Sequence, residues 1–402
     1  MIKNILIVTD CFPPNFAPRM GALSSNLKNM GINVTVISED NSEKHYNLPH
    51  LPKDIYRYNY QASLSKVKYY LKTAVNLVYD HKSRAFYKRF SSAIKGGKFD
   101  LVLCSTFNEF PLSLAYRISR KLNIPLVCDM RDLIEQFGDI KYSHTAFSSN
   151  AFNRFFVSLL RGKRIRKRNF VLSKAAAVTT VSPWHKEFLS KINSNVHLIY
   201  NGYSSDIFYP QEKISSTFDI IYTGRFLDSN TDSLNMLFSA VEELGIKDLR
   251  LVWYTDSKSG VTIKKALEKY PKCMECAEIN DMVSIQEVPN LLTESSVVLV
   301  LNYNSEANHT KGIMTTKFFE AVGVEKPVLC VRGDDGCLSQ VIGETNAGVA
   351  AKDDTQIKDF ITEKYNEWQK NGFTRQNIRN KEYFCRENQA KQFIEIFNTL
   401  IK

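Results

Sequence analysis

Short apolar runs alternate with longer amphipathic segments along the chain, and this alternation predicts parallel strands connected by helices. Continuous runs of four or five apolar, often β-branched residues are typical of strands that are buried on both faces of a sheet. The first series of predicted strands lies at residues 5–8, 34–37, 101–104, 125–128, 177–181 and 196–199.

The pattern restarts after the turn-rich segment Asn201–Asp206, with strands predicted at 219–222, 249–253, 297–301 and 327–331. Two such series predict an α/β fold of two doubly wound, Rossmann-like parallel-sheet domains facing a central cleft. We place the N-terminal domain at 1–205 and the C-terminal domain at 206–380. Apolar residues spaced three and four apart in 381–402 predict a final helix that packs back across the domains.

Composition supports this reading and limits the class of protein. A chain of 402 residues is long enough for two domains, and 44% apolar with 24% charged residues is typical of globular proteins. No apolar run reaches the roughly 18 residues that a membrane-spanning helix needs, and the first ten residues do not resemble a secretory signal. We therefore expect a cytoplasmic protein.

The eight cysteines are scattered, which favours reduced thiols over a disulfide framework. Cys273 and Cys276 form a C-x-x-C, but a structural zinc site needs four ligands, and no second pair lies at suitable spacing. Chance spacing is the simpler interpretation, and we predict no metal site.

The positive charge is confined to the first half of the chain. Residues 1–210 hold 30 Lys or Arg and 14 Asp or Glu, a net charge of +16, whereas residues 211–402 have a net charge of −5. Nine basic residues and one acid lie between Lys66 and Lys98. No acid occurs from Ile140 to Lys186, where the predicted outward-facing basic residues are Lys163, Arg164, Arg166, Lys167 and Arg168.

Three interpretations of these basic stretches remain open. They can be solvated helix faces, they can neutralise nucleic-acid phosphates, or they can contact an anionic membrane leaflet. Apolar residues adjoin the basic ones in segments of helix length, and no nucleic-acid-binding module is recognisable. We therefore favour a peripheral position at the inner face of the membrane and expect no nucleic-acid partner.

Three segments at predicted strand ends or helix starts offer candidate chemistry, because ligands of parallel sheets bind at the carboxyl ends of the strands. The first runs from Thr9 through Pro14 to Arg19, and the second is Asp129–Asp132. In the third, Lys311–Glu320, a loop runs into a helix whose start, with Thr315, Thr316 and Lys317, favours an anion. No G-x-G-x-x-G, Walker or G-x-S-x-G motif is present, so neither dinucleotide oxidoreduction nor ATP-dependent phosphoryl transfer is supported.

The order of these segments resembles bacterial glycosyltransferase family 4 enzymes of the GT-B fold, over nearly the whole chain. The resemblance rests on Phe12-Pro13-Pro14, on the segments 99–105 and 124–133, on the junction 177–210, on Tyr222-Thr223-Gly224-Arg225 and on Lys317–Val328. Segments 99–105 and 124–133 look like the branch of the family that makes surface polysaccharides.

The resemblance implies roles for individual residues. Glu320 would hold the nucleotide ribose, although a helix-capping or solvent-facing Glu is an equal alternative, and Arg225 after Gly224 would neutralise the diphosphate. Arg131 occupies the position of the family's acceptor-side His and Asp132 that of the following acid, and we expect Arg131, Asp132 and Asp129 to be the catalytic residues. Arg131 and Asp132 could instead form a structural ion pair with each other.

Two residues of the family pattern are missing. Position 312, where the family has the first Glu of its E-x7-E pair, is Gly, and no Lys follows Arg225 within a few residues. Lys317 beside Glu320 replaces them. These departures put the usual inference about sugar recognition in doubt.

The implied activity is transfer of a sugar from a nucleotide-diphosphate donor, a UDP-sugar, to a hydroxyl of a glycan or lipid-linked acceptor in cell-surface glycan synthesis. Negative charge develops on the leaving phosphate, so Arg225, Lys317 and the helix start can stabilise it without a metal or other cofactor. The family implies retention at the anomeric carbon. A non-catalytic sugar-nucleotide or glycan-binding protein and a sugar-nucleotide epimerase of related fold remain alternatives.

Overall fold

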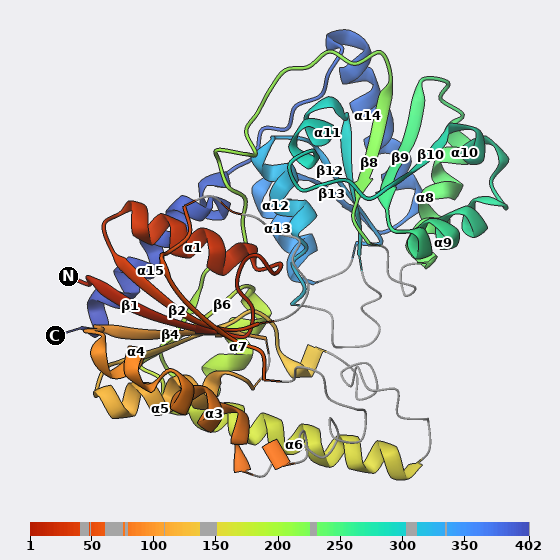
Figure 1. Ribbon diagram of the computed structural model, residues 1–402. Coiled ribbons are helices and arrows are strands. Elements are labelled where there is room, and N and C mark those ends of the chain that lie inside the picture. Colours follow the sequence, from red (N-terminus) through yellow and green to blue (C-terminus); the bar gives the residue numbers. More distant parts are fainter. Residues whose placement is uncertain are drawn as a thin grey trace. The chain divides into compact units, whose positions relative to one another are not determined.

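The structure, a computed structural model, describes residues 1–40, 48, 50–60, 75–76, 79–107, 109–136, 151–225, 231–302, 312–333 and 336–401, without the side chains of 151–160. It divides into two compact units (Figure 1). Unit 1 comprises Met1–Tyr200 together with Arg386–Lys402, and unit 2 comprises Asn201–Cys385.

Unit 1 is built on a seven-stranded parallel sheet in the order β3-β2-β1-β4-β5-β6-β7. The register pairs Ile7 of β1 with Val36 of β2 on one side and with Leu103 of β4 on the other. The strands are β1 (Asn4–Thr9), β2 (Asn33–Glu39), β3 (Asp54–Tyr58), β4 (Leu101–Thr106), β5 (Leu126–Met130), β6 (Ala177–Thr180) and β7 (Val196–Leu198).

Helices cover both faces of this sheet because successive residues of a buried strand point to opposite sides. Ile5, Ile7 and Leu103 pack with α1 (Pro18–Asn29) and α15 (Arg386–Leu400). Leu6, Val8 and Cys104 pack on the other face. There they meet α3 (His81–Arg89), α4 (Ser91–Gly96), α5 (Leu112–Leu122), the end of α6 (Ala151–Lys174) and α7 (Pro183–Ser190).

The C-terminal helix α15 packs against α1 of unit 1. Of the residues in the predicted apolar stripe, Ala390, Phe393 and Phe397 are buried in the apolar cluster beneath α1, whereas Ile394, Leu400 and Ile401 are only partly buried against it. The side chain of Asn398 also accepts a hydrogen bond of 2.9 Å from the backbone N–H of Ile2. The last turns of the chain therefore complete the core that its first strand begins.

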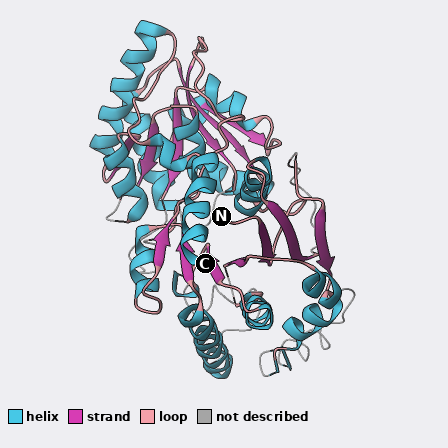
Figure 2. Ribbon diagram, turned by 90° about the vertical axis from the view of Figure 1, so that its left-hand side faces the viewer, coloured by secondary structure: helices cyan, strands magenta, loops and turns pink. Residues whose placement is uncertain are grey.

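Unit 2 is a six-stranded parallel sheet in the order β10-β9-β8-β11-β12-β13. Figure 2 shows helices on both sides of the strands in each unit. The strands are β8 (Phe218–Thr223), β9 (Leu249–Thr255), β10 (Ala277–Asp281), β11 (Val297–Leu301), β12 (Val328–Val331) and β13 (Gly348–Ala351). The helices are α8 (Thr231–Leu244), α9 (Ser257–Leu267), α10 (Pro271–Cys276), α11 (Val288–Glu294), α12 (Thr316–Gly323), α13 (Cys337–Thr345) and α14 (Asp354–Asn371).

The sequence pattern did not predict β3, β10 and β13, and all three lie at the edge of a sheet. β3 and β10 have no fully buried residue, and β13 has one. Edge strands are covered on fewer sides, so they do not need the continuous apolar runs on which the prediction relied.

Both sheets reverse strand order beside their first strand, between β1 and β4 in unit 1 and between β8 and β11 in unit 2. Loops that follow strands flanking such a point diverge and leave room for a ligand. The residues after β1, β4 and β5, and those after β8, are therefore the places to look for chemistry.

Candidate functional site

Asp10, Thr106 and Arg131 meet at the carboxyl edge of the unit 1 sheet. Asp10 directly follows β1, Thr106 ends β4, and Arg131 directly follows β5. Arg131 Nη2 lies 2.5 Å from Asp10 Oδ1, and Thr106 Oγ1 donates to Asp10 Oδ2 at 3.1 Å. Sequence reasoning placed Asp10 in a candidate loop but did not identify it as the partner of Arg131.

Asp132 follows Arg131 in the sequence but takes no part in the Asp10–Arg131 ion pair. The alternative considered above, an ion pair between Arg131 and Asp132, does not form, because the guanidinium binds Asp10 instead. Within the described residues, no hydrogen bond or ion pair involves the Asp132 carboxylate. Burial raises the pKa of Asp132 to about 6, although Arg131 opposes this increase. Asp132 can therefore carry or release a proton near neutral pH.

Asp129 and Arg19 form a buried ion pair with each other. The prediction that Asp129 follows its strand is wrong, because β5 continues to Met130 and the Asp129 side chain is fully buried. Arg19 donates to both carboxylate oxygens at 3.1 and 2.8 Å, and its Nη1 donates to the Tyr200 carbonyl at 2.6 Å. The guanidinium also lies 5.4 Å from the centre of the Phe393 ring.

The hydroxyls of Ser105 and Thr179 donate to the same Asp129 carboxylate. Burial alone would raise the pKa of Asp129, but Arg19 and these hydroxyls hold it below the ordinary value. Every strong contact of Asp129 is thus internal, two residues before Arg131. The arrangement gives Asp129 and Arg19 the contacts of positioning residues.

The loop that contains Pro14 is held by a residue that the sequence did not point to. Arg57 of β3 donates to the backbone carbonyls of Phe12 and Pro13. Pro14 itself is partly exposed. The loop after β1 is thus fixed to the edge of its own sheet.

In unit 2, Gly224 and Lys317 lie against each other at the carboxyl end of β8. The φ angle of Gly224 is +108°, in a region that side chains disfavour, and a β-carbon there would lie 3.3 Å from Lys317 Nζ. Lys317 belongs to the first turn of α12, whose N-cap residue Thr315 makes no side-chain capping bond. The sequence prediction had grouped these residues as a donor site.

Lys317 is a largely unpaired cation. Burial lowers its pKa, and Glu320, one turn further along α12, partly opposes this. Its ammonium lies 4.8 Å from the centre of the Tyr222 ring, and no ion pair reaches it from the described part of the chain. The first-turn N–H groups of a helix lack partners within the helix, so this corner combines several donors suited to an anion. Thr316 is exposed at the same helix start.

Arg225 reaches out into solvent from the turn after Gly224. Its side chain is 78% exposed, and its Nε lies 3.5 Å from the Asp256 carboxylate, a separation typical of a weak surface pair. The Tyr222 hydroxyl donates to the Arg225 carbonyl at 2.7 Å, which fixes the backbone of this turn. Position 311, part of the third predicted segment, lies outside the described residues.

The basic residues of α6 do not form one outward face. Lys163 and Arg166 are exposed, whereas Arg164 lies 3.7 Å from Glu109 and Lys167 lies 2.9 Å from Asp80. The prediction that Arg168 faces outward is wrong. Its side chain is completely buried and binds Glu135 through two bonds of 2.7 Å. Residues 66–74 and 77–78 of the other basic stretch lie outside the described part of the chain.

None of the eight cysteines, all of which lie in described residues, forms a disulfide. Cys276 donates to the backbone carbonyl of Cys273, so this C-x-x-C makes a local contact within α10. Among the described residues, no group of three His, Cys, Asp or Glu side chains is arranged to hold a metal ion. None of the described helices has the length and apolar character needed to cross a bilayer.

Comparison with known proteins gives a family match over part of the chain. Residues 19–206, which cover most of unit 1, match the family model Glycosyltransferase Family 4. No curated protein sequence matches the chain significantly.

Solved structures match both units. Sucrose-phosphate synthase from Thermosynechococcus elongatus superposes with a TM-score of 0.62 over 99% of each chain, at 14% identity. HepE from Anabaena, in complex with UDP-glucose, gives 0.63 over 99% of this chain and 100% of HepE, at 12% identity. The lipopolysaccharide outer core galactosyltransferase WaaB gives 0.55 over 98% and 99%, at 12% identity. Residues 19–206 thus match glycosyltransferase family 4, and both units have the fold of the GT-B glycosyltransferases.

Proposed function

We propose that this enzyme transfers a sugar from a UDP-sugar to a hydroxyl of a glycan or lipid-linked acceptor in cell-surface glycan synthesis. It would retain the anomeric configuration and use no metal ion. The structural relatives support both the proposed donor and the proposed class of acceptor. HepE was solved with UDP-glucose, and WaaB is a lipopolysaccharide galactosyltransferase.

The observation that carries the proposal is the position of Lys317. A largely buried ammonium without an ion-pair partner in the described residues lies beside the backbone of Gly224, at the start of α12. Burying a cation without a counter-ion costs free energy, which a bound diphosphate would recover. Glu320, on the following turn, is positioned to accept hydrogen bonds from a ribose diol.

The same groups suit the chemical step. When the bond between the sugar and UDP breaks, negative charge grows on the leaving diphosphate. Lys317, the helix start near Thr315 and Thr316, and the exposed Arg225 would stabilise this charge more in the transition state than in the ground state. In this scheme fixed cations do the work that a divalent metal ion does in other transferases.

The acceptor side would be the carboxyl edge of unit 1. Arg131, held by Asp10, presents a fixed positive charge, and burial raises the pKa of Asp132 to about 6. A partly exposed ring, Phe107, lies 5.7 Å from the Arg131 guanidinium and offers an apolar surface to a sugar ring. We assign acceptor binding and proton handling to this cluster.

We place the enzyme at the cytoplasmic face of the membrane, bound peripherally. The charge division along the chain supports this, because the excess of Lys and Arg is confined to the first 210 residues. Lys163 and Arg166 are exposed on α6. Anionic lipids attract such residues by about 1 kcal/mol each.

The test measures UDP released from UDP-glucose, with and without EDTA, for the wild type and for Lys317→Gln and Glu320→Gln. We expect slow UDP release that EDTA does not change, and losses of about a hundredfold in both variants. The matched control is Lys370→Gln, which removes an exposed charge from α14 and should behave like the wild type.

Conversion of the nucleotide sugar into its epimer, without UDP release, would replace this function by an epimerase. UDP binding without any turnover, in the presence of a range of glycan acceptors, would indicate a binding protein. Loss of activity in EDTA that Mg²⁺ restores would contradict the metal-independent step.

A further inference from the structure

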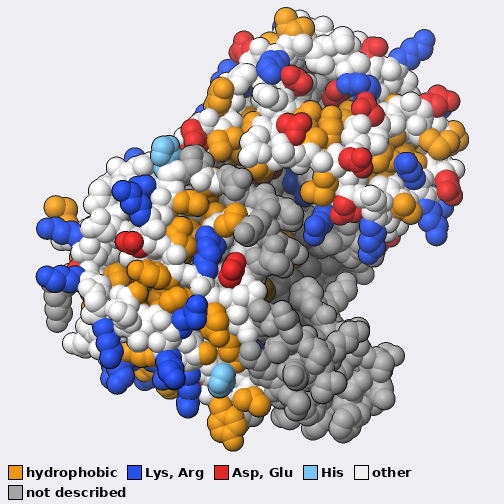
Figure 3. Space-filling model, viewed as in Figure 1, with side chains coloured by type: hydrophobic (Ala, Val, Ile, Leu, Met, Phe, Trp, Pro, Cys, Tyr) orange, Lys and Arg blue, Asp and Glu red, His pale blue; other side chains and the backbone are white. Residues whose placement is uncertain are grey.

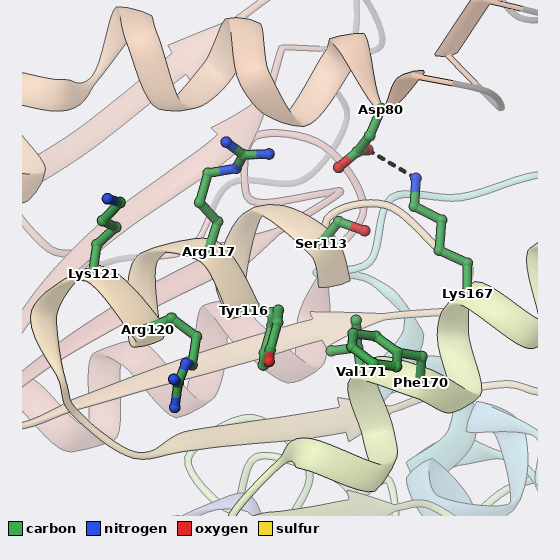
Figure 4. A pocket seen from close by; sticks show the side chains of 9 residues that line it. All are labelled: Asp80, Ser113, Tyr116, Arg117, Arg120, Lys121, Lys167, Phe170 and Val171. Carbon is green, nitrogen blue, oxygen red and sulfur yellow. Dashed lines mark hydrogen bonds and ion pairs between the residues drawn. The ribbon is translucent and has the colours of Figure 1, made fainter.

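A pocket of about 560 Å³ lies among α3, α5 and α6 of unit 1, away from the Asp10–Arg131 cluster. Figure 4 shows its lining. Arg117 and Lys121 extend from α5 toward α3, while Arg120 and Tyr116 extend from the opposite side of α5, and Phe170 faces them from α6. We call it the α5–α6 pocket. Its volume lies in the range of small-molecule sites, roughly 300–1,000 Å³.

The α5–α6 pocket has an unbalanced positive charge. Lys167 is neutralised at 2.9 Å by Asp80, the one acidic residue among the lining residues that the structure describes. Arg117, Arg120 and Lys121 have no ion pair in the described part of the chain. The Nε of Arg117 is buried and lacks a hydrogen-bond partner there. Three cations without ion-pair partners among the described residues line the same pocket, which favours an anionic ligand.

One wall of the pocket is aromatic. Tyr116 of α5 and Phe170 of α6 form an edge-to-face pair with ring centres 5.8 Å apart. Phe170 is nevertheless 55% exposed, although it is a large apolar side chain. An exposed aromatic ring beside unpaired cations matches the boundary between lipid head groups and acyl chains.

The helices around the pocket are also rich in basic residues. The helices α3, α5 and α6 contain no Asp or Glu between their first and last residues. Exposed basic residues on them include Arg84, Lys88, Lys163 and Arg166. Figure 3 shows Lys and Arg side chains gathered beside hydrophobic ones along the lower edge of this unit.

We propose that the α5–α6 pocket binds the phosphate head group of an anionic phospholipid, held by cationic side chains of α5 that line it, with Phe170 directed to the acyl chains. This inference rests on the membrane association proposed above. It goes further, because it replaces diffuse attraction by a defined head-group site. A soluble phosphate ester has the same anionic group but cannot use the exposed Phe170.

The first experiment is flotation with vesicles of phosphatidylcholine alone or mixed with phosphatidylglycerol. The wild type should float only with the anionic vesicles. R120Q/K121Q should bind roughly three hundredfold more weakly, because it loses charge-assisted hydrogen bonds to the phosphate as well as about fivefold of diffuse attraction per charge. The matched control R84Q/K88Q removes the same charge from α3 and should lose only the diffuse part, about thirtyfold or less.

Equal losses in the two double variants would show diffuse attraction and overturn the head-group site. Equal flotation of the wild type with both kinds of vesicle would overturn it as well. Phe170→Ser should weaken binding to anionic vesicles without any change of charge, and no effect would contradict the assigned orientation.

The second experiment separates the two sources of phosphate. Calorimetric titration with a short-chain phosphatidylglycerol should give binding that R120Q/K121Q loses, whereas glycerol 3-phosphate should bind at least tenfold more weakly. Equal affinity for both would assign the pocket to a soluble phosphate ester and refute the lipid assignment. UDP binding by the same variants should be unchanged. A protein that floats but does not bind UDP would therefore disprove the donor proposal and leave the pocket standing.

Discussion

The ammonium of Lys317 lies 4.8 Å from the centre of the Tyr222 ring, so a cation–π contact joins the end of strand β8 to the start of α12. Tyr222 also fixes the next turn, through the bond from its hydroxyl to the Arg225 carbonyl. Two features of the proposed donor site thus depend on one aromatic side chain.

Replacing Tyr222 by Leu should therefore weaken UDP binding about fivefold to tenfold, since a desolvated cation–π contact contributes roughly 1–2 kcal/mol. Tyr222→Phe keeps the ring and loses only the hydroxyl, so its UDP affinity should stay within about twofold to threefold of the wild type. Isothermal titration with UDP measures both. A larger loss in the Phe variant than in the Leu variant would contradict the role given to the ring.

A second prediction concerns Asp10, which holds Arg131 at the edge of unit 1. Asp10→Asn should lower the rate of sugar transfer about a hundredfold, because a guanidinium displaced by about 1 Å no longer fits the reacting groups. UDP affinity should not change, since Lys317 and Gly224 belong to unit 2. Steady-state kinetics with a saturating donor, together with UDP titration, separate the two effects. Parallel loss of UDP binding would place Asp10 in the donor site instead.

The buried pair of Arg168 and Glu135 should contribute to stability. Glu135→Gln leaves the completely buried guanidinium without its counter-ion and should lower the free energy of unfolding by about 3 kcal/mol. The double variant E135L/R168M removes both charges and should recover much of this loss. Urea unfolding followed by circular dichroism gives the comparison. Binding to anionic vesicles should be the same in all three proteins, because Arg168 does not reach the surface.

His185 should make the fold sensitive to acid. It is buried, and this burial lowers its pKa to about 3 from an ordinary value of 6.5. Between these values the unfolded chain binds a proton that the folded chain does not. The free energy of unfolding should therefore fall as the pH falls, by up to about 1.4 kcal/mol per pH unit.

Asp132 titrates in the same region with the opposite sign, because its raised pKa makes the folded chain bind the extra proton. The informative quantity is thus the difference between the wild type and His185→Phe. This difference in thermal stability should shift in favour of the variant as the pH is lowered from 6.5 toward 4. A difference that is independent of pH would show that His185 is not buried in its neutral form.

Arg117→Met should have opposite effects on stability and on lipid binding. Because the Arg117 Nε is buried without a hydrogen-bond partner in the described residues, replacing it by an apolar chain should leave the melting temperature unchanged or raise it by a few degrees. Affinity for vesicles that contain phosphatidylglycerol should fall about fivefold. A variant that is less stable and binds lipid normally would assign Arg117 to the core of unit 1.

The sequence pattern predicted the central strands of both sheets well, since buried parallel strands need continuous apolar runs. The edge strands β3, β10 and β13 were missed because their partly exposed residues do not have this signal. The inward direction of Arg168 had a usable signal, because Arg168 shares a helix face with the buried Val171, Leu172 and Ala175. The six Lys and Arg residues within 161–168 obscured this signal.

The pairing of Asp10 with Arg131 lies beyond pattern reasoning. The two residues are 121 positions apart, and they meet because β4 enters the sheet between β1 and β5. The strand order creates this contact, so the spacing of residues along the sequence does not predict it. The resemblance to the family supplied Arg131 as a candidate, but only the fold supplied its partner.

The packing of α15 on α1 determines when unit 1 can finish folding on the ribosome. The helix that seals the apolar cluster around Phe393 and Phe397 is translated after all of unit 2. Until then, the α1 side of the first sheet remains an uncovered apolar surface, which chaperones recognise or which drives aggregation. Nascent chains arrested before Arg386 should therefore be captured by chaperones more strongly than full-length chains.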